Sequence, residues 1–277
     1  MSQTEPKYLN NDSAPLMQLI LEKITLPTRP THLLRRRLMR VLSESLGTGT
    51  STVVSGRAGS GKTTLVADFA RDCERAAAWY KVEAPESDLR VFLNYFIASI
   101  QFQRPKFGRN FMTLPESGVL DDIPLLAEAL VYEMITTETE PLLIVLEDLH
   151  LVGDAAWLVP FFGRLLPLLP ADVHMLMTSR TIPPAPLWRM RSKQSLYVIE
   201  EDQLAFTQQE AIELFESRGL SREQAGLALK ITRGRASALG LLVEALVKNK
   251  SAAGNQRSAF RVNSRTPGLH FLQASDH

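Results

Sequence analysis

The chain of 277 residues has one cysteine, few aromatic residues (7%) and almost no net charge. A single cysteine, Cys73, excludes an internal disulfide and is typical of a reducing compartment. Lys and Arg total 31 against 30 Asp and Glu, so there is no strong basic field to recruit nucleic acid or anionic lipid. The composition, with 45% hydrophobic residues, also excludes a wholly disordered chain or a collagen-like fibre.

Long hydrophobic runs are missing as well. The longest, such as residues 142–146, are far below the ~18 residues that a membrane-spanning helix needs. The apolar stretch at residues 16–21 is short and follows no basic leader, so it is not typical of a secretion signal. We therefore expect a soluble, cytoplasmic protein. The five histidines show no metal-ligand spacing, which argues against a zinc site.

Five short apolar runs have the character of strands in a parallel sheet. They are continuous rather than alternating, as strands covered by helices on both faces require. Helical patterns lie between them, and this alternation favours an α/β fold with right-handed crossovers. The strands are expected at residues 51–55, 77–82, 142–146, 173–178 and 196–199, and the helices at 63–73, 89–102, 124–136 and 156–166.

The character of the chain changes along its length. A polar, turn-rich start gives way to an arginine-rich helix from Leu33 and then to the strand–helix alternation. After residue 202 only helical patterns remain, opened by capping boxes at 207–210 and 221–224. We therefore predict a loose leader (1–23), an α/β domain with its lead-in segment (24–202), a small helical domain (203–248) and a disordered tail (249–277).

The sequence GRAGSGKT, which begins at Gly56, satisfies the phosphate-binding pattern G-x-x-x-x-G-K-[ST]. Its glycines let successive backbone N–H groups turn inward to form an anion-binding nest, and the following helix adds the positive end of its dipole. The Lys62 ammonium reaches the β- and γ-phosphates and the Thr63 hydroxyl binds Mg²⁺. The residues expected to bind the nucleotide here are Gly56, Arg57, Ala58, Gly59, Ser60, Gly61, Lys62, Thr63 and Thr64.

An apolar strand at residues 142–146 is followed by two acids, Glu147 and Asp148. The carboxyl ends of parallel strands meet at one edge of a sheet, so both acids are expected beside the phosphate loop. One carboxylate would bind Mg²⁺ and the other would position or deprotonate an attacking water. Adjacent strand residues point to opposite faces, so the two cannot share one role. A solvated strand end without function is the alternative.

Together these motifs resemble the N-terminal ATPase region of the MalT-like regulators, in the STAND class of signal-transducing P-loop NTPases. The resemblance covers about residues 24–247. It implies an adenine nucleotide held between the two domains, with ATP/ADP exchange as a switch. The stretches that carry it are LPTRPTHLLRRRLMRVL, GRAGSGKTTL, AAAWYKVE, LLIVLEDLH, MLMTSRTIPPAPLWRMR and FTQQEAIELF.

The resemblance also implies roles for individual residues. Arg180 matches an arginine that senses the terminal phosphate; it follows the fourth strand, which in this sheet class lies between the phosphate-loop strand and the acidic strand. Arg35 and Arg37 match arginines near the expected base. The implied set is Lys62, Asp148 and Arg180 for catalysis, Thr63, Glu147 and Asp148 for Mg²⁺, and Arg35 and Arg37 for ATP or ADP.

Three features depart from the family pattern. Glu147 stands where Asp is common, and its extra methylene moves the carboxylate. Residues 233–236 (RGRA) stand where the family usually has Gly-x-Pro, whose proline packs near the base. Family members also continue into a winged-helix region, a helical-repeat sensor and often a DNA-binding domain, which this sequence does not include.

Two basic features have alternative interpretations as nucleic-acid contacts. The arginines between residues 35 and 40 are more typical of a solvated helix face. Residues 221–247 fit the family's helical lid better than a helix-turn-helix, so direct DNA binding by this segment is not expected. His150, beside the acidic strand end, is a candidate contact to nucleotide or water, although a packed loop histidine is commoner.

The sequence therefore predicts a P-loop NTPase sheet of about five mostly parallel strands with flanking helices, followed by a small helical domain. The predicted function is an ATP-binding signal-transduction module of a MalT-like transcriptional regulator, with slow Mg²⁺-dependent hydrolysis of ATP. An effector or protein partner and an oligomer are compatible with this function, and no membrane partner is expected. Two alternatives stay open: an AAA-type ring ATPase, and a non-hydrolysing interaction module that retains the fold.

Overall fold

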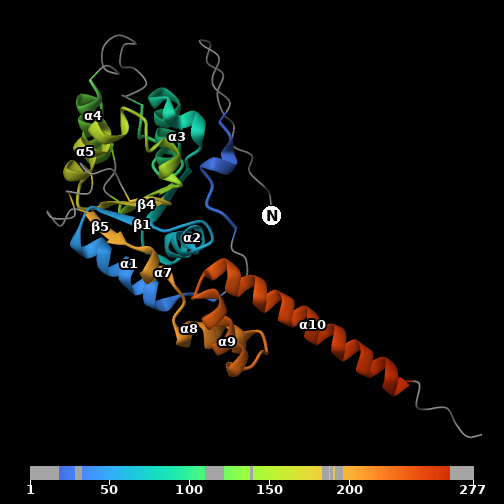
Figure 1. The fold of residues 1–277 in the computed structure, drawn as a ribbon. Helices are drawn as coiled ribbons and strands as arrows, with labels where there is room; N and C mark the ends of the chain where they lie inside the picture. Colours follow the sequence, from blue (N-terminus) through green and yellow to red (C-terminus); the bar gives the residue numbers. More distant parts are fainter. Residues whose placement is uncertain are drawn as a thin grey trace, which may run out of the picture.

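The computed structural model describes residues 19–28, 33–109, 122–137, 140–182, 187, 190 and 196–262. Its centre is a five-stranded sheet with the order β2-β3-β4-β1-β5, in which every neighbouring pair is parallel (Figure 1). The predicted place of the fourth strand is confirmed, because β4 pairs with β1 on one side and β3 on the other. The strands are β1 (Ser51–Ser55), β2 (Ala76–Lys81), β3 (Leu142–Glu147), β4 (Val173–Ser179) and β5 (Leu196–Ile199).

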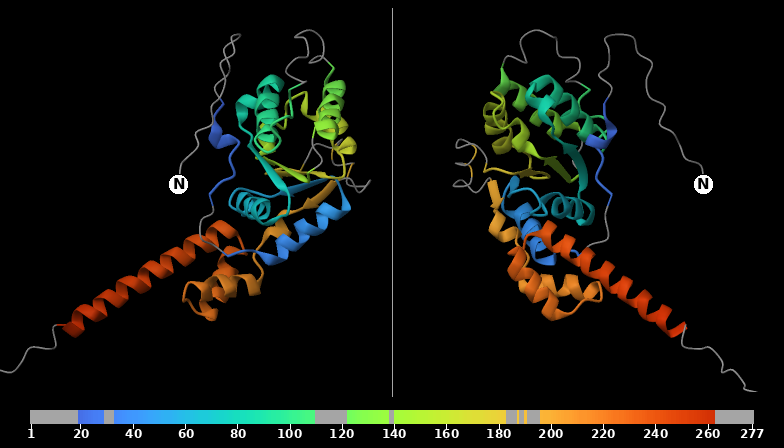
Figure 2. Two further views of the ribbon diagram at one scale, coloured as in Figure 1. Left: turned by 180° about the vertical axis from the view of Figure 1, so that it is seen from behind. Right: turned by 45° about the vertical axis from the view of Figure 1, so that its right-hand side comes forward.

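Helices cover both faces of the sheet (Figures 1 and 2). An aromatic-rich core that includes Phe92 and Phe161 lies under α3, α4 and α5, and a second core that includes Leu38 and Phe69 lies under α1 and α2. Burial on both faces explains why the strand sequences are continuously apolar. The helices are α1 (Arg36–Thr48), α2 (Lys62–Asp72), α3 (Leu89–Gln101), α4 (Ile123–Thr137) and α5 (Leu158–Leu168), with 3-10 turns η1 (Leu21–Lys23), η2 (Ala84–Ser87) and η3 (Leu149–Val152).

The last three helices after β5 form a small core of their own, which includes Phe215 and Leu239, whereas Leu204 of α7 packs in the core under α1 and α2. Both expected capping boxes are present: Thr207 accepts from the Glu210 N–H, and Ser221 accepts from the Gln224 N–H. These caps satisfy backbone donors at the helix starts and fix where α8 and α9 begin. The helices are α7 (Glu201–Leu204), α8 (Gln208–Ser217), α9 (Arg222–Thr232) and α10 (Ala236–Val262).

Both ends differ from the expected segments. Residues 1–18 and 263–277 lie outside the described residues. Lys23, expected to end a loose leader, is 5% exposed and forms an ion pair with Glu86. The helix α10 continues to Val262, past the expected boundary at residue 248. Apolar periodicity detects burial, whereas this stretch is rich in helix-favouring Ala, Lys, Gln and Arg that need no buried face.

Within the part of the chain that the structure describes, no helix is both long enough and apolar enough to span a membrane.

Candidate nucleotide-binding site

The phosphate loop connects the end of β1 at Ser55 to the start of α2 at Lys62. Gly59 and Gly61 have φ angles of 78° and 92°, in the left-handed region that glycine adopts without a Cβ clash. Gly61 is also the N-cap of α2. The loop therefore leads directly into a helix N-terminus, where backbone N–H groups and the helix dipole both favour an anion.

The Lys62 side chain lies inside this loop. The residue is 7% exposed, and its ammonium donates hydrogen bonds to the backbone oxygens of Gly56 and Arg57. Burial lowers the pKa of Lys62, while the nearby Asp148 carboxylate acts in the opposite direction. The ammonium can exchange these two neutral oxygens for phosphate oxygens without leaving its place.

Thr63 and Glu147 meet at the edge of the sheet, because β3 ends beside the start of α2. The Thr63 hydroxyl donates a hydrogen bond to the Glu147 carboxylate. Burial raises the pKa of Glu147, and the Thr63 hydrogen bond opposes that rise. A hydroxyl and a carboxylate are oxygen donors of the kind Mg²⁺ prefers, so this pair suits the expected metal.

Asp148 follows Glu147 in a left-handed conformation, with φ 60°. Its backbone N–H donates to the Thr178 hydroxyl of β4 at 2.9 Å. This conformation costs energy in a residue that is not glycine, and such positions cluster at functional sites. Asp148 lines the pocket described next, which Glu147 does not.

A pocket of about 530 Å³ lies between the phosphate loop and the helical domain. This volume is within the range of about 300–1,000 Å³ typical of small-molecule sites. The α/β side contributes Ala58, Gly59, Gly61, Lys62, Thr63, Thr64, Leu65, Asp68, Asp148 and Arg180, and the rest of the lining comes from Leu33, Arg35, Phe206, Leu214, Arg218, Ala236, Ser237, Gly240, Val243 and Glu244.

Most of the expected site residues are brought together here, but Gly56, Arg57, Ser60, Arg37 and Glu147 do not line the pocket. The Arg57 side chain turns to Glu201, with 2.8 Å between its Nε and Oε1. Glu147 is buried and accepts a hydrogen bond from Thr63, which does line the pocket. The nucleotide was expected between the two domains, but none of the lining residues that follow residue 202, such as Phe206 and Ser237, was named as a site residue.

Arg35 and Arg37 meet the hinge between the two domains. Arg35 donates to backbone oxygens in the segment 203–205 at 2.7 and 3.0 Å and to the Glu210 carboxylate at 3.1 Å. Its guanidinium also lies over the Phe206 ring, 4.1 Å from the centroid. Arg37 donates to the same segment at 2.9 and 3.2 Å. Arg35 thus both lines the pocket and fixes the hinge, whereas Arg37 only fixes the hinge.

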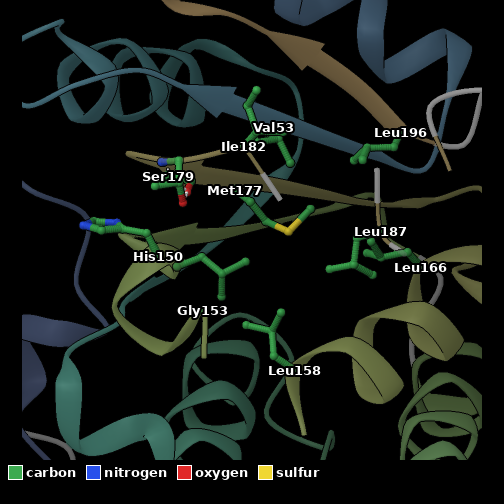
Figure 3. Close-up of a pocket in the computed structure, with 12 residues that line it drawn as sticks. Val53, His150, Gly153, Leu158, Leu166, Met177, Ser179, Ile182, Leu187 and Leu196 are labelled. Atoms are coloured by element: carbon green, nitrogen blue, oxygen red, sulfur yellow. Dashed lines mark hydrogen bonds between the residues drawn. The ribbon is translucent and has the colours of Figure 1, made fainter. Parts of the chain in front are cut away.

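His150 lines a second, smaller pocket of about 40 Å³ (Figure 3). This pocket lies between strand residues such as Met177 and the apolar side chains Leu158 and Leu166. The His150 Nδ1 is 3.8 Å from the Asp148 carboxylate, too far for a hydrogen bond, and burial lowers the pKa of the imidazole. His150 does not line the pocket at the phosphate loop, and neither of its buried ring nitrogens has a hydrogen-bond partner among the described residues.

The strand order, the phosphate loop after β1 and the acids after β3 define a P-loop NTPase fold. No known family model matches the chain. The chain is 29% identical over 265 residues to the HTH-type transcriptional regulator MalT of Serratia proteamaculans, and 27% identical over 264 residues to that of Yersinia enterocolitica. Each match covers 94% of this chain and 28% of the relative. The expected resemblance to MalT-like regulators is thereby confirmed, and the chain spans 28% of the length of these relatives.

Solved structures with a similar fold include a Walker-type ATPase of Pyrococcus abyssi, with 14% identity, a TM-score of 0.49 and coverage of 87% of this chain and 79% of that chain. Another is the replication initiator DnaA bound to AMPPCP and single-stranded DNA, with 15% identity, a TM-score of 0.43 and coverage of 82% and 65%.

Proposed function

We propose that this chain binds ATP and ADP with Mg²⁺ between its two domains and acts as a nucleotide switch in a regulator of the MalT type. The observation that carries the proposal is a phosphate loop, with its lysine in place, that opens into an interdomain pocket. The similarity to transcriptional regulators named MalT supports a signalling role rather than a metabolic one. A cytoplasmic location, which the single Cys73 favours, is part of the proposal.

The position of each site residue suggests its role in binding phosphate, binding Mg²⁺ or orienting water. Lys62 neutralises the β- and γ-phosphates, and Thr63 with Glu147 and Asp148 would hold Mg²⁺, which supplies further charge neutralisation. Asp148 lines the pocket in a left-handed turn and is the better placed acid to orient an attacking water. Slow hydrolysis is consistent with a switch, because the ATP-bound state must last long enough to act on the rest of the regulator.

Lys62→Ala is expected to weaken ADP and ATP binding by about tenfold to a hundredfold. A charge-assisted hydrogen bond is worth ~1.5–3 kcal/mol, and each 1.4 kcal/mol is about a factor of ten in affinity. Thermal melting with and without Mg-ATP measures this, because ligand at one hundred times its dissociation constant stabilises the wild type by ~2.7 kcal/mol. Lys230→Ala is the control, since Lys230 is an exposed lysine outside the pocket. Equal melting shifts in wild type and Lys62→Ala would contradict the proposal.

Arg180→Ala is expected to reduce the preference for ATP over ADP while leaving ADP affinity nearly unchanged. A guanidinium can bind a terminal phosphate bidentately, and ADP has no γ-phosphate to offer. A ligand shifts a conformational equilibrium only by its differential affinity for the two states. Both dissociation constants should be measured, with Arg164→Ala as control because that exposed arginine pairs with Glu128. Equal weakening of ATP and ADP would show a general phosphate contact instead.

A further inference from the structure

Three successive residues of the phosphate loop are each hydrogen-bonded to the segment after β5. The Arg57 N–H donates to the Glu201 carboxylate at 3.2 Å. The Ala58 oxygen accepts from the Arg235 guanidinium, and the Gly59 oxygen accepts from the Ser237 N–H at 3.0 Å. These partners come from the start of α7 and the start of α10, so two places after β5, one of them in the helical domain, hold the loop backbone directly.

The geometry of the peptide unit shows which way the N–H and C=O groups of the loop face. In a trans peptide unit the C=O and N–H bonds point in opposite directions. The unit between Gly56 and Arg57 follows this rule: its oxygen accepts from Lys62, and its N–H points away from Lys62 to Glu201. Glu201 therefore fixes the orientation of a carbonyl that faces the lysine.

The unit between Arg57 and Ala58 has the same orientation, since its oxygen also accepts from Lys62, whereas the two units after it are turned the other way. Because the Ala58 oxygen is held by Arg235, the Gly59 N–H must point away from Arg235. Because the Gly59 oxygen is held by Ser237, the Ser60 N–H must point away from Ser237, and it donates to the Arg57 oxygen at 3.3 Å. That oxygen also accepts from Lys62, so this N–H lies on the side of the lysine.

The contact leaves no room for a side chain at Gly59 and little at Gly61. A Cβ built on Gly59 would lie 2.3 Å from the Ser237 hydroxyl oxygen, and one on Gly61 would lie 3.1 Å from the Ala236 Cβ. The backbone of the loop is thus packed against the start of α10. An N–H nest binds an anion only when its donors already point inward, and this packing keeps them so.

We propose that Arg235 and Glu201 are positioning residues that hold the phosphate loop in its anion-binding form from the chain that follows β5. The inference rests on the proposed function, since it concerns the same nucleotide. Neither side chain lines the pocket, so both act through the loop and not on the nucleotide. The affinities for ADP and ATP therefore fall together when either side chain is removed, because both nucleotides use the same nest.

Arg235 and Glu201 have opposite charges, so their removal distinguishes a positioning role from a direct electrostatic effect on nucleotide affinity. Removing a cation near a phosphate weakens binding through charge, whereas removing an anion strengthens it. Positioning predicts that Arg235→Ala and Glu201→Ala both weaken binding. Each loses a hydrogen bond that involves a charged group and is partly exposed, so about a threefold to tenfold loss is expected for each.

The experiment measures dissociation constants of ADP and ATP, with Mg²⁺, for the wild type, Arg235→Ala, Arg235→Lys and Glu201→Ala. Arg222→Ala is the matched control, since it removes one positive charge from an exposed pair with Glu216 in the same domain. Arg235→Lys should recover part of the affinity because an ammonium can still donate to the Ala58 oxygen. Melting temperatures without nucleotide verify that each variant is folded.

Equal losses for ADP and ATP in both alanine variants, with Arg222→Ala unchanged, support the inference. Tighter binding by Glu201→Ala overturns it in favour of electrostatics. A loss confined to ATP overturns it in favour of a terminal-phosphate contact, and unchanged affinities overturn it outright. If the wild type binds neither nucleotide, the proposed function itself fails, which is a distinct result.

Discussion

Lys23→Met is expected to lower the free energy of unfolding by about 3–5 kcal/mol, because it leaves a buried carboxylate without its partner. Glu86 has no exposed surface, and Lys23 is 5% exposed. The ammonium donates to Glu86 and lies 4.5 Å from the centroid of the Tyr95 ring. Although burial acts to lower it, hydrogen bonds to Glu86 and Glu83 hold the pKa of Lys23 above its ordinary value. Lys23 is therefore charged at neutral pH, and the stability that its raised pKa represents is lost as the pH rises through that elevated pKa.

The measurement is urea-induced unfolding, with Lys23→Met/Glu86→Leu as the second variant. Replacing both charges by apolar groups of similar size is often nearly neutral, so the double variant should recover most of the lost stability. A single variant as stable as the wild type would show that the ion pair contributes nothing. A double variant as unstable as the single one would show that packing, rather than charge, is what Lys23 supplies.

Glu210→Ala is expected to have a similarly large effect, about 3–5 kcal/mol, and to loosen the hinge. Glu210 is 7% exposed and Arg35 is 8% exposed, so the substitution leaves a buried guanidinium without its carboxylate. Burial lowers the pKa of Arg35, and the hydrogen bond that it donates to Glu210 opposes that fall. The Glu210 carboxylate also accepts from the Thr207 N–H at 2.9 Å, so one helix cap is lost as well.

Unfolding and limited proteolysis around residues 203–206 measure the two effects of Glu210→Ala. Glu213→Ala is the control, because Glu213 is an exposed glutamate on the same helix. The variant should be cut faster than both wild type and control. If Glu210→Ala and Glu213→Ala behave alike, Arg35 keeps its place through the backbone oxygens of the hinge alone.

Local sequence patterns were enough to predict the site residues that lie in the α/β domain. The phosphate loop, its flanking strand and helix, and the acids after β3 each occupy one continuous stretch, and a parallel sheet brings them to one edge. Of the sheet order, the prediction covered only the place of the fourth strand between the phosphate-loop strand and the acidic strand, and it came from the sheet class rather than from a local pattern. The particular residues of the second wall could not be predicted, because contacts such as that between Ser237 and Gly59 join residues far apart in the sequence and no local pattern pairs them.

The arginines of the lead-in segment show the same limit. Their match to a family position placed Arg35 and Arg37 near the base, and Arg35 does line the pocket. Their hydrogen bonds, however, go to backbone oxygens of residues 203–205, where the chain crosses between domains and helix-internal donors are lacking. These backbone oxygens need hydrogen-bond donors only once the chain is folded. The sequence around residue 35 therefore could not predict that Arg35 and Arg37 supply them.

Because α10 is long, a small rotation of its first turn moves its far end a long way. The helix has 27 residues, and its first turn contacts the phosphate loop while its far end projects away from both domains (Figure 2). At 1.5 Å per residue it is about 40 Å long. A rotation of about 5° at the loop would carry the far end at Val262 through ~3.5 Å, so a small change in the pocket wall that α10 forms becomes a displacement of side-chain size.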